Sequence, residues 1–246
     1  MSEDKPKLKV LDLFSGILIG GFSLGLERTG GFETVAFCEI EEFPRKVLKK
    51  HWPKVPCYHD VTTAEFSDLK PVDMVTGGFP CQDISLAGKG AGLAGERSSL
   101  FWHIIRTVRV VGQPTLLLEN VAALLGRGMG VVVGALAQIG YDAEWHCIPA
   151  RSLGAPHGRD RLWIVANPQW DEQPRPEPCI WPFGRMGRVE QSVAWDRGWE
   201  NTLTALRRMD DGLSRSVDRT DGLRNAVVPQ IPELIGHAIL EARAVA

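Results

Sequence analysis

The chain has 246 residues, a formal net charge of −2 at pH 7 and 44% hydrophobic residues, which is enough to bury one sizeable core. No stretch approaches the roughly 18 unbroken apolar residues of a membrane-spanning helix, and the start MSEDKPKLKV lacks the apolar segment of a secretory signal. The composition therefore argues against membrane and secreted classes and predicts a cytoplasmic globular protein.

Strand-like and helix-like patterns alternate from the N-terminus to about residue 167. Residues 7–16 predict a strand that ends in a glycine-rich turn, and residues 20–30 predict the helix behind it. The alternation continues with a strand at 32–40, a helix at 41–52, a strand at 72–79, a helix at 99–111, a strand at 114–121, a helix at 131–140 and closing strands at 141–150 and 161–167. This order predicts an α/β fold with a doubly wound, mostly parallel sheet in one domain, residues 1–167.

The pattern changes after this domain. Residues 168–206 are rich in Pro, Arg and Trp and have little periodicity, which indicates a small irregular lobe; a surface loop or a disordered insert has the same composition. Residues 207–246 form a C-terminal segment, in which apolar residues at helical spacing from about Pro229 predict a helix that packs back on the first domain.

The cysteines bear on metal sites and redox state. They are odd in number and include no CxxC pair, which argues against a disulfide framework and against a zinc site. We therefore expect free thiols and no bound metal. The five are Cys38, Cys57, Cys81, Cys147 and Cys179.

Glycines and acids follow the first strands in the order that a nucleotide site needs. Gly16, Gly20 and Gly21 allow the backbone to approach a ligand closely, although the turn lacks the GxGxxG spacing of dinucleotide-binding proteins. Glu39 ends the second strand, where an acid commonly binds ribose hydroxyls, and Asp60 has the chemistry to accept a hydrogen bond from an adenine amine. Each acid taken alone is more simply a solvated surface group.

A cysteine and a glutamate each follow an apolar stretch that predicts a buried strand. Cys81 comes after DMVTGGFP, and Glu119 comes after PTLLL. Active sites of open α/β sheets lie at the carboxyl ends of the strands, where a thiol and a carboxyl group can attack and protonate one electrophilic ring. A cysteine after proline is in most proteins simply a small buried hydrophobe, so this pair alone leaves both interpretations open.

The motifs DLFSG, FPCQDIS, ENV and NAVVP, in this order between residues 8 and 240, resemble the DNA (cytosine-5) methyltransferase family of the bacterial or bacteriophage type. The resemblance implies a Rossmann-like methyltransferase fold with residues 168–206 as a short target-recognition lobe. It implies methyl transfer from S-adenosylmethionine to carbon 5 of a cytosine that is flipped out of double-stranded DNA. We expect a monomer that acts on DNA, as in restriction-modification systems.

The resemblance also implies a role for each matching residue. Cys81 would add to cytosine carbon 6, and Glu119 would hydrogen-bond or protonate ring nitrogen 3. Arg161 would contact the oxygen at position 2, and Arg159 would help hold Cys81 and the base; a surface ion pair with Asp160 is their alternative role. The cofactor site would comprise Asp12, Phe14, Ser15, Gly16, Gly20, Gly21, Glu39, Ile40, Asp60, Val61, Pro80, Leu100, Asn225 and Ala226. DNA contacts would come from Gln82, Ser85, Lys89 and Arg97, the last three in a glycine-rich stretch with the composition of a mobile lid.

Three positions depart from the family pattern, and two other functions stay open. FSGILIGGFS is two residues longer than FSGIGGFS, Arg224 stands where the family usually has Gly, and His157 replaces a Gln. The first two departures fall beside the cofactor and favour weaker S-adenosylmethionine binding or a reshaped donor pocket. The alternatives are a tRNA cytosine-5 methyltransferase, whose branch typically has PPC instead of FPC, and a catalytically impaired DNA-binding homologue. The lobe's tryptophans either pack its core, which we favour, or stack on DNA: Trp170, Trp181, Trp195 and Trp199.

Overall fold

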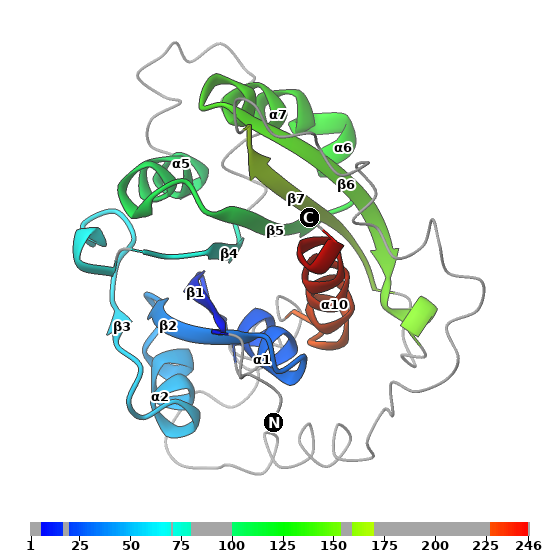
Figure 1. Ribbon diagram of the computed structural model, residues 1–246. Helices are drawn as coiled ribbons and strands as arrows, with labels where there is room; N and C mark the ends of the chain where they lie inside the picture. The colour runs from blue at the N-terminus through cyan, green and yellow to red at the C-terminus, as the bar shows by residue number, and fades with distance from the viewer. Residues whose placement is uncertain are drawn as a thin grey trace, which may run out of the picture.

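A seven-stranded sheet forms the centre of the protein, with helices on both of its faces (Figure 1). The computed structural model describes residues 6–16, 20–69, 71–79, 100–153, 159–169 and 227–245. The strands lie in the order β3-β2-β1-β4-β5-β7-β6. Their bounds are β1 (Leu8–Leu13), β2 (Phe32–Cys38), β3 (Cys57–Tyr58), β4 (Met74–Gly78), β5 (Thr115–Val121), β6 (Tyr141–Pro149) and β7 (Asp160–Pro168).

Strand directions confirm the predicted α/β fold with a doubly wound, mostly parallel sheet. Strands β3, β2, β1, β4 and β5 pair in parallel, whereas β7 runs antiparallel to both β5 and β6. The two closing strands thus enter the sheet out of chain order, with β7 between β5 and β6. This arrangement brings the start of β7 to the edge at which β5 ends.

Helices cover the two faces because each buries one apolar stripe. The helices are α1 (Gly21–Arg28), α2 (Glu42–His51), α5 (Leu100–Val111), α6 (Leu124–Arg127), α7 (Met129–Gln138) and α10 (Gln230–Val245), with short 3-10 turns η1 (Ser67–Leu69) and η2 (Ala150–Leu153). In α5 the spacing of Phe101, Ile104, Ile105 and Val108 follows the helical period, and all four are buried in one core cluster. Burying each such side chain stabilises the fold by about 1.5–3 kcal/mol.

The helix predicted near Pro229 is found as α10, and it packs closely on α1. Close approach depends on glycines: a Cβ on Gly25 would lie 2.2 Å from the Pro229 carbonyl oxygen, and one on Gly21 would lie 2.6 Å from that of Val227. The Nη1 of Arg28 lies 3.5 Å from an oxygen of Glu233. The two helices therefore form one layer on the same face of the sheet.

Among the described helices, none has the length and apolar character that crossing a membrane requires.

Candidate active site

The ends of β4 and β5 place Glu119 beside the strand that leads to the predicted nucleophile. In the parallel β4–β5 ladder Gly78 pairs with Glu119, and the buried Phe79 follows Gly78 directly. A Cβ on Gly78 would lie 3.1 Å from Glu119 Oε2, which is tighter than ordinary contact, so glycine makes room for the carboxylate. Glu119 itself is only 7% exposed. The predicted acid is therefore a buried group at the expected sheet edge.

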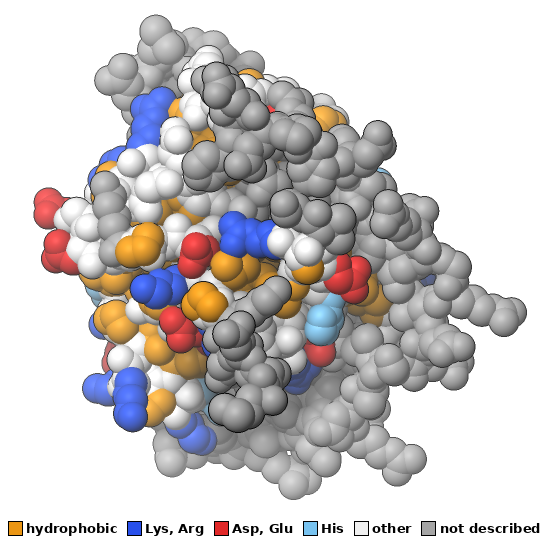
Figure 2. All heavy atoms as spheres, viewed as in Figure 1, with side chains coloured by type: hydrophobic (Ala, Val, Ile, Leu, Met, Phe, Trp, Pro, Cys, Tyr) orange, Lys and Arg blue, Asp and Glu red, His pale blue; other side chains and the backbone are white. Residues whose placement is uncertain are grey.

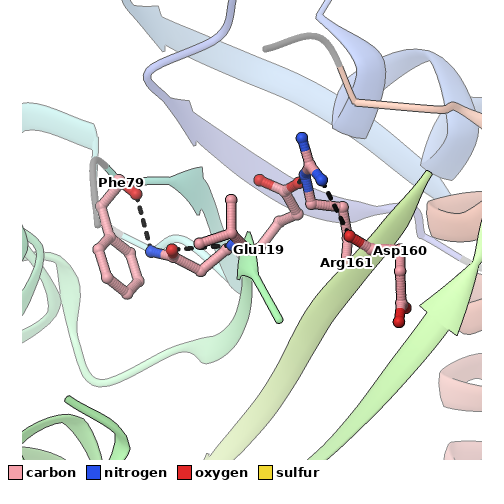
Figure 3. A network of polar contacts seen from close by, with 6 residues as sticks. Phe79, Glu119, Asp160 and Arg161 are labelled. Atoms are coloured by element: carbon pink, nitrogen blue, oxygen red, sulfur yellow. Dashed lines mark hydrogen bonds and ion pairs between the residues drawn. The ribbon is translucent and has the colours of Figure 1, made fainter. Parts of the chain in front are cut away.

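Arg161 at the start of β7 faces the carboxylate of Glu119. Its Nε lies 2.9 Å from Glu119 Oε1, and its Nη1 donates a 2.9 Å hydrogen bond to the carbonyl oxygen of Asp160 (Figure 3). The two side chains form an ion pair in which the carboxylate is the more buried partner. Burial raises the pKa of Glu119, while the positive charges of Arg161 and Arg159 oppose the rise. Burial has the larger effect, because the net direction is upward.

Arg159 is the second cation near Glu119. The pKa of its guanidinium is lowered to about 10: burial and the neighbouring charge of Arg161 lower it, and the carboxylate of Glu119 opposes them. At neutral pH the group still carries its positive charge. The structure thus brings three of the four predicted catalytic residues, Glu119, Arg159 and Arg161, close enough for their charges to interact.

Asn120 is a site residue that the sequence analysis missed. Its side chain is buried, its Nδ2 donates a 2.8 Å hydrogen bond to the carbonyl oxygen of Phe79, and its Oδ1 accepts one of 2.8 Å from the Val121 amide (Figure 3). Asn120 therefore fixes the backbone position that immediately precedes Pro80 and Cys81. The available signal was a polar residue within an apolar strand, inside the ENV motif.

Glu39 joins the end of β2 to the glycine-rich turn after β1. Its Oε2 accepts a 2.9 Å hydrogen bond from the Gly16 amide, and its Oε1 accepts one of 2.8 Å from the Glu41 amide. The turn itself is bound to β2 through a 2.8 Å hydrogen bond from the Phe14 amide to the Cys38 carbonyl. Phe14 has φ 56°, a left-handed conformation that costs a bulky residue about 1–3 kcal/mol and often marks a functional turn.

Asp12, predicted as part of the cofactor site, directs its carboxylate into the protein. It is 0% exposed, and its two oxygens accept 2.8 Å hydrogen bonds from Ser23 Oγ of α1 and Thr76 Oγ1 of β4. Burial raises its pKa to about 6, and the two hydrogen bonds oppose this rise. The Ser15 hydroxyl donates a 2.8 Å bond to the Asp12 carbonyl. In this geometry the Asp12 carboxylate joins the end of β1 to α1 and β4, and its part in the cofactor site stays a prediction.

The other described residues of the predicted cofactor site lie around the same edge. Asp60 follows β3 and accepts a 2.8 Å hydrogen bond from the Thr62 amide, which lowers the pKa of its carboxyl group. Val61 is buried in the core, and Ile40 beside Glu39 is 56% exposed, an unusual value for a large apolar side chain. Leu100 begins α5, Gly21 begins α1, and Gly20 with φ 48° is the N-cap of α1.

The described residues include no cluster of His, Cys, Asp or Glu arranged to hold a metal ion.

The other predicted positions lie outside the described residues. They are Pro80, Cys81, Gln82, Ser85, Lys89, Arg97, His157, Arg224, Asn225, Ala226, residues 17–19 around the two-residue insertion and almost all of the lobe at 168–206. Their roles and the division into domains therefore stay predictions.

Comparison with known proteins identifies the family. A model of the family described as C-5 cytosine-specific DNA methylase matches residues 8–183. Type II methyltransferase M2.BsuMI of Bacillus subtilis is 36% identical over 168 residues, 65% of this chain and 42% of its own. Type II methyltransferase M1.ScrFI of Lactococcus lactis subsp. cremoris is 32% identical over 200 residues, 78% of this chain and 50% of its own. The chain thus spans about half the length of the curated relatives it matches.

Solved structures show the same fold. The crystal structure of the S. pombe Dnmt2 methyltransferase matches with a TM-score of 0.58 over 97% of each chain, at 15% sequence identity. An identity this low supports the fold alone. The extent of the family match goes further: the chain belongs to the C-5 cytosine-specific DNA methylase family.

Proposed function

We propose that the chain is an S-adenosylmethionine-dependent DNA (cytosine-5) methyltransferase that acts on a flipped cytosine through a covalent adduct with Cys81. One observation carries the proposal. Glu119, a buried acid with a raised pKa, lies against Arg161 and beside the strand end that leads to Cys81. Membership of the C-5 cytosine-specific DNA methylase family supports a DNA cytosine as the substrate of the proposed site.

The chemistry needs an acid that holds its proton near a ring nitrogen. When the Cys81 thiolate forms a bond to carbon 6 of cytosine, an electron pair moves into the ring, and a proton or hydrogen bond from Glu119 at nitrogen 3 stabilises it. Burial of Glu119 favours the protonated form that this step uses. Arg161, already paired with Glu119, is the proposed contact for the oxygen at position 2. Arg159 is proposed to help hold Cys81 and the base. Once carbon 5 has accepted the methyl group, a base removes the hydrogen from carbon 5, and the Cys81 thiolate leaves carbon 6.

The described cofactor residues fit S-adenosylmethionine. Glu39 ends β2 next to Gly16 and retains lone pairs beyond its two amide contacts, as ribose hydroxyls need. Exposed Ile40 offers an apolar surface for an adenine ring, and Asp60 offers an acceptor for the adenine amine. When bound, this cofactor supplies an electrophilic methyl group. We expect the side chain of Asp12 to support the turn from the interior.

The DNA side of the proposal rests on local contacts. Figure 2 shows hydrophobic side chains and side chains of both charges intermixed on the face that Figure 1 presents. Affinity for duplex DNA would then depend on local cations and not on the net charge of −2. The proposed contacts are Gln82, Ser85, Lys89 and Arg97, with residues 168–206 as the recognition lobe and the monomer as the active species.

A methyl-transfer assay with labelled S-adenosylmethionine tests this function. Wild-type protein and Cys81→Ser would be incubated with mixed-sequence duplex DNA and, separately, with total tRNA. Cys147→Ser is the matched control, because Cys147 is an exposed free thiol on β6. We expect label in DNA with wild type and Cys147→Ser, and none with Cys81→Ser, which still binds S-adenosylhomocysteine.

Other outcomes would contradict the proposal in different ways. Label in tRNA and not in DNA would assign the RNA branch of the family. Absence of label in both substrates, with DNA binding intact, would indicate the impaired homologue. Calorimetric titration with S-adenosylmethionine tests the two departures near the cofactor, and low-micromolar or tighter binding would remove the hypothesis of a weakened site.

A further inference from the structure

The segment from Asp60 to Ala64 forms a tight turn in which three backbone amides donate hydrogen bonds to Asp60. The Asp60 carbonyl accepts hydrogen bonds from the amides of Thr63 (3.2 Å) and Ala64 (2.8 Å), and its side chain accepts the one from Thr62. Such a turn leaves its own carbonyl oxygens on the opposite side, as at the carboxyl end of a helix. These oxygens concentrate partial negative charge at one point and favour a cation there.

Arg106 of α5 supplies that cation. Its Nη1 donates to the Thr62 carbonyl at 2.9 Å, and its Nη2 donates to the carbonyls of Val61 at 2.5 Å and Ala64 at 3.3 Å. A planar guanidinium can direct two nitrogens at three acceptors in a fixed geometry, which an ammonium group on a flexible stem does not reproduce. The segment after β3 lies beside α5, and Val61 shares a core cluster with Phe101 and Ile105 of that helix (Figure 1).

This contact joins two elements of the adenine side of the site. Asp60 and Val61 come from the turn, and Leu100 is the first residue of the same helix that carries Arg106. The turn follows a strand of only two residues, β3, so the sheet alone gives it little support. Arg106 is itself an exposed side chain, so its contribution to global stability is small, whereas its effect on the position of this turn is direct.

We propose that Arg106 is a positioning residue: it fastens the turn Asp60–Ala64 to helix α5 and thereby sets the distance between Asp60 and Leu100. It acts through the backbone of Val61, Thr62 and Ala64 and does not touch the bound molecule. The identity of the ligand at this edge rests on the proposed function, whereas the clamp itself does not.

Two measurements on the full chain test the clamp. The first is amide hydrogen exchange of Thr62, Thr63 and Ala64 without any ligand. Arg106→Ala is expected to increase their exchange by about tenfold, because hydrogen bonds to a charged group are the stronger ones. Arg106→Lys is expected to restore only part of the protection. Arg109→Ala, in the last turn of the same helix and also exposed, is the matched control and should match wild type.

The second measurement is calorimetric titration with S-adenosylhomocysteine and with its analogue that carries a 6-oxo group in place of the adenine amine. The wild type is expected to prefer the amine, and Arg106→Ala is expected to lose most of this preference, since Asp60 no longer has a fixed position. Equal exchange in Arg106→Ala and Arg109→Ala would overturn the clamp. Failure of the wild type to bind either compound would overturn the proposed function instead, and the exchange experiment would then decide the clamp alone.

Discussion

Arg161 places its Nε 2.9 Å from Oε1 of Glu119, across the antiparallel pairing of β5 and β7. The pKa of the Glu119 carboxyl group is therefore subject to two opposing effects. Burial favours the neutral acid, and the cation favours the carboxylate. Because burial has the larger effect, Glu119 holds its proton to a higher pH than a surface glutamate does, and Arg161 limits how high.

Replacing Arg161 by Gln should therefore raise the pKa of Glu119 further. If protonated Glu119 is the active form, the rate of methyl transfer falls as pH rises through its pKa, and this alkaline limb should move to higher pH in Arg161→Gln. Glu119→Gln should lack the limb and be slower by about 10²–10⁴-fold, the usual contribution of a general acid. The pH profile of kcat checks both. A limb that stays in place, or moves to lower pH, would contradict the assigned pair.

Gly78→Ala should displace Glu119 without unfolding the protein. The added Cβ would lie 3.1 Å from Glu119 Oε2, so the carboxylate must move by a few tenths of an ångström. We expect kcat to fall by about tenfold or more, because catalytic groups tolerate little misplacement. Gly134→Ala in α7 is the control, since its Cβ would meet open space. Equal kcat values for the two variants would show that the position of Glu119 is not limiting.

Asn120→Ala should weaken the support of the strand end before Cys81. The substitution leaves the buried Phe79 carbonyl without its 2.8 Å partner, which is expected to cost about 1–3 kcal/mol of stability. It should also lower kcat more than it lowers affinity for S-adenosylhomocysteine, because most of the residues predicted for the cofactor site lie at the ends of β1, β2 and β3. Urea unfolding, calorimetry and the methyl-transfer assay measure the three quantities. Loss of cofactor affinity with kcat preserved would contradict this role.

The sequence predicts the parallel half of this fold well, because strands buried on both faces are continuous apolar runs between helical patterns. It predicts the two closing strands but not their order, since the pairing of β7 with β5 joins Val121 to Arg161, far apart in the chain. Contacts such as Asn120 with Phe79 and Arg106 with Val61 are missed for the same reason: they bridge 41 and 45 positions. Motifs identify residue types, and only the folded chain shows which of them meet.

The environment of Asp12 is a second feature that a motif does not provide. The DLFSG motif predicts that Asp12 belongs to the cofactor site, and the structure adds that its carboxylate is fully buried between Ser23 and Thr76. The sequence around Asp12 does not show which face of the sheet its side chain is on. Apolar residues precede and follow it, so the strand has no alternation of polar and apolar residues that would distinguish the two faces.

Asp12→Asn should remove a pH-dependent penalty on folding. Burial raises the pKa of Asp12 from 3.8 to about 6, so the folded protein keeps a proton that the unfolded chain has already released. The wild type therefore loses stability as pH rises from about 4 to about 6. The free energy of unfolding of the variant relative to wild type should increase by up to about 3 kcal/mol over this window and then stay level. Urea unfolding at several pH values measures it, and a constant difference would contradict the raised pKa.

Covalent trapping tests the central claim most directly. Duplex DNA with 5-fluorocytosine in place of cytosine would be incubated with the protein and S-adenosylmethionine. A base can remove a proton from carbon 5 but cannot remove a fluorine atom, so the thiolate is not eliminated and the covalent adduct persists. We expect a denaturation-resistant protein–DNA complex with the DNA attached at Cys81, formed equally by wild type and Cys147→Ser. Failure to form this complex, or attachment at another residue, while the same protein methylates ordinary duplex DNA, would contradict the mechanism.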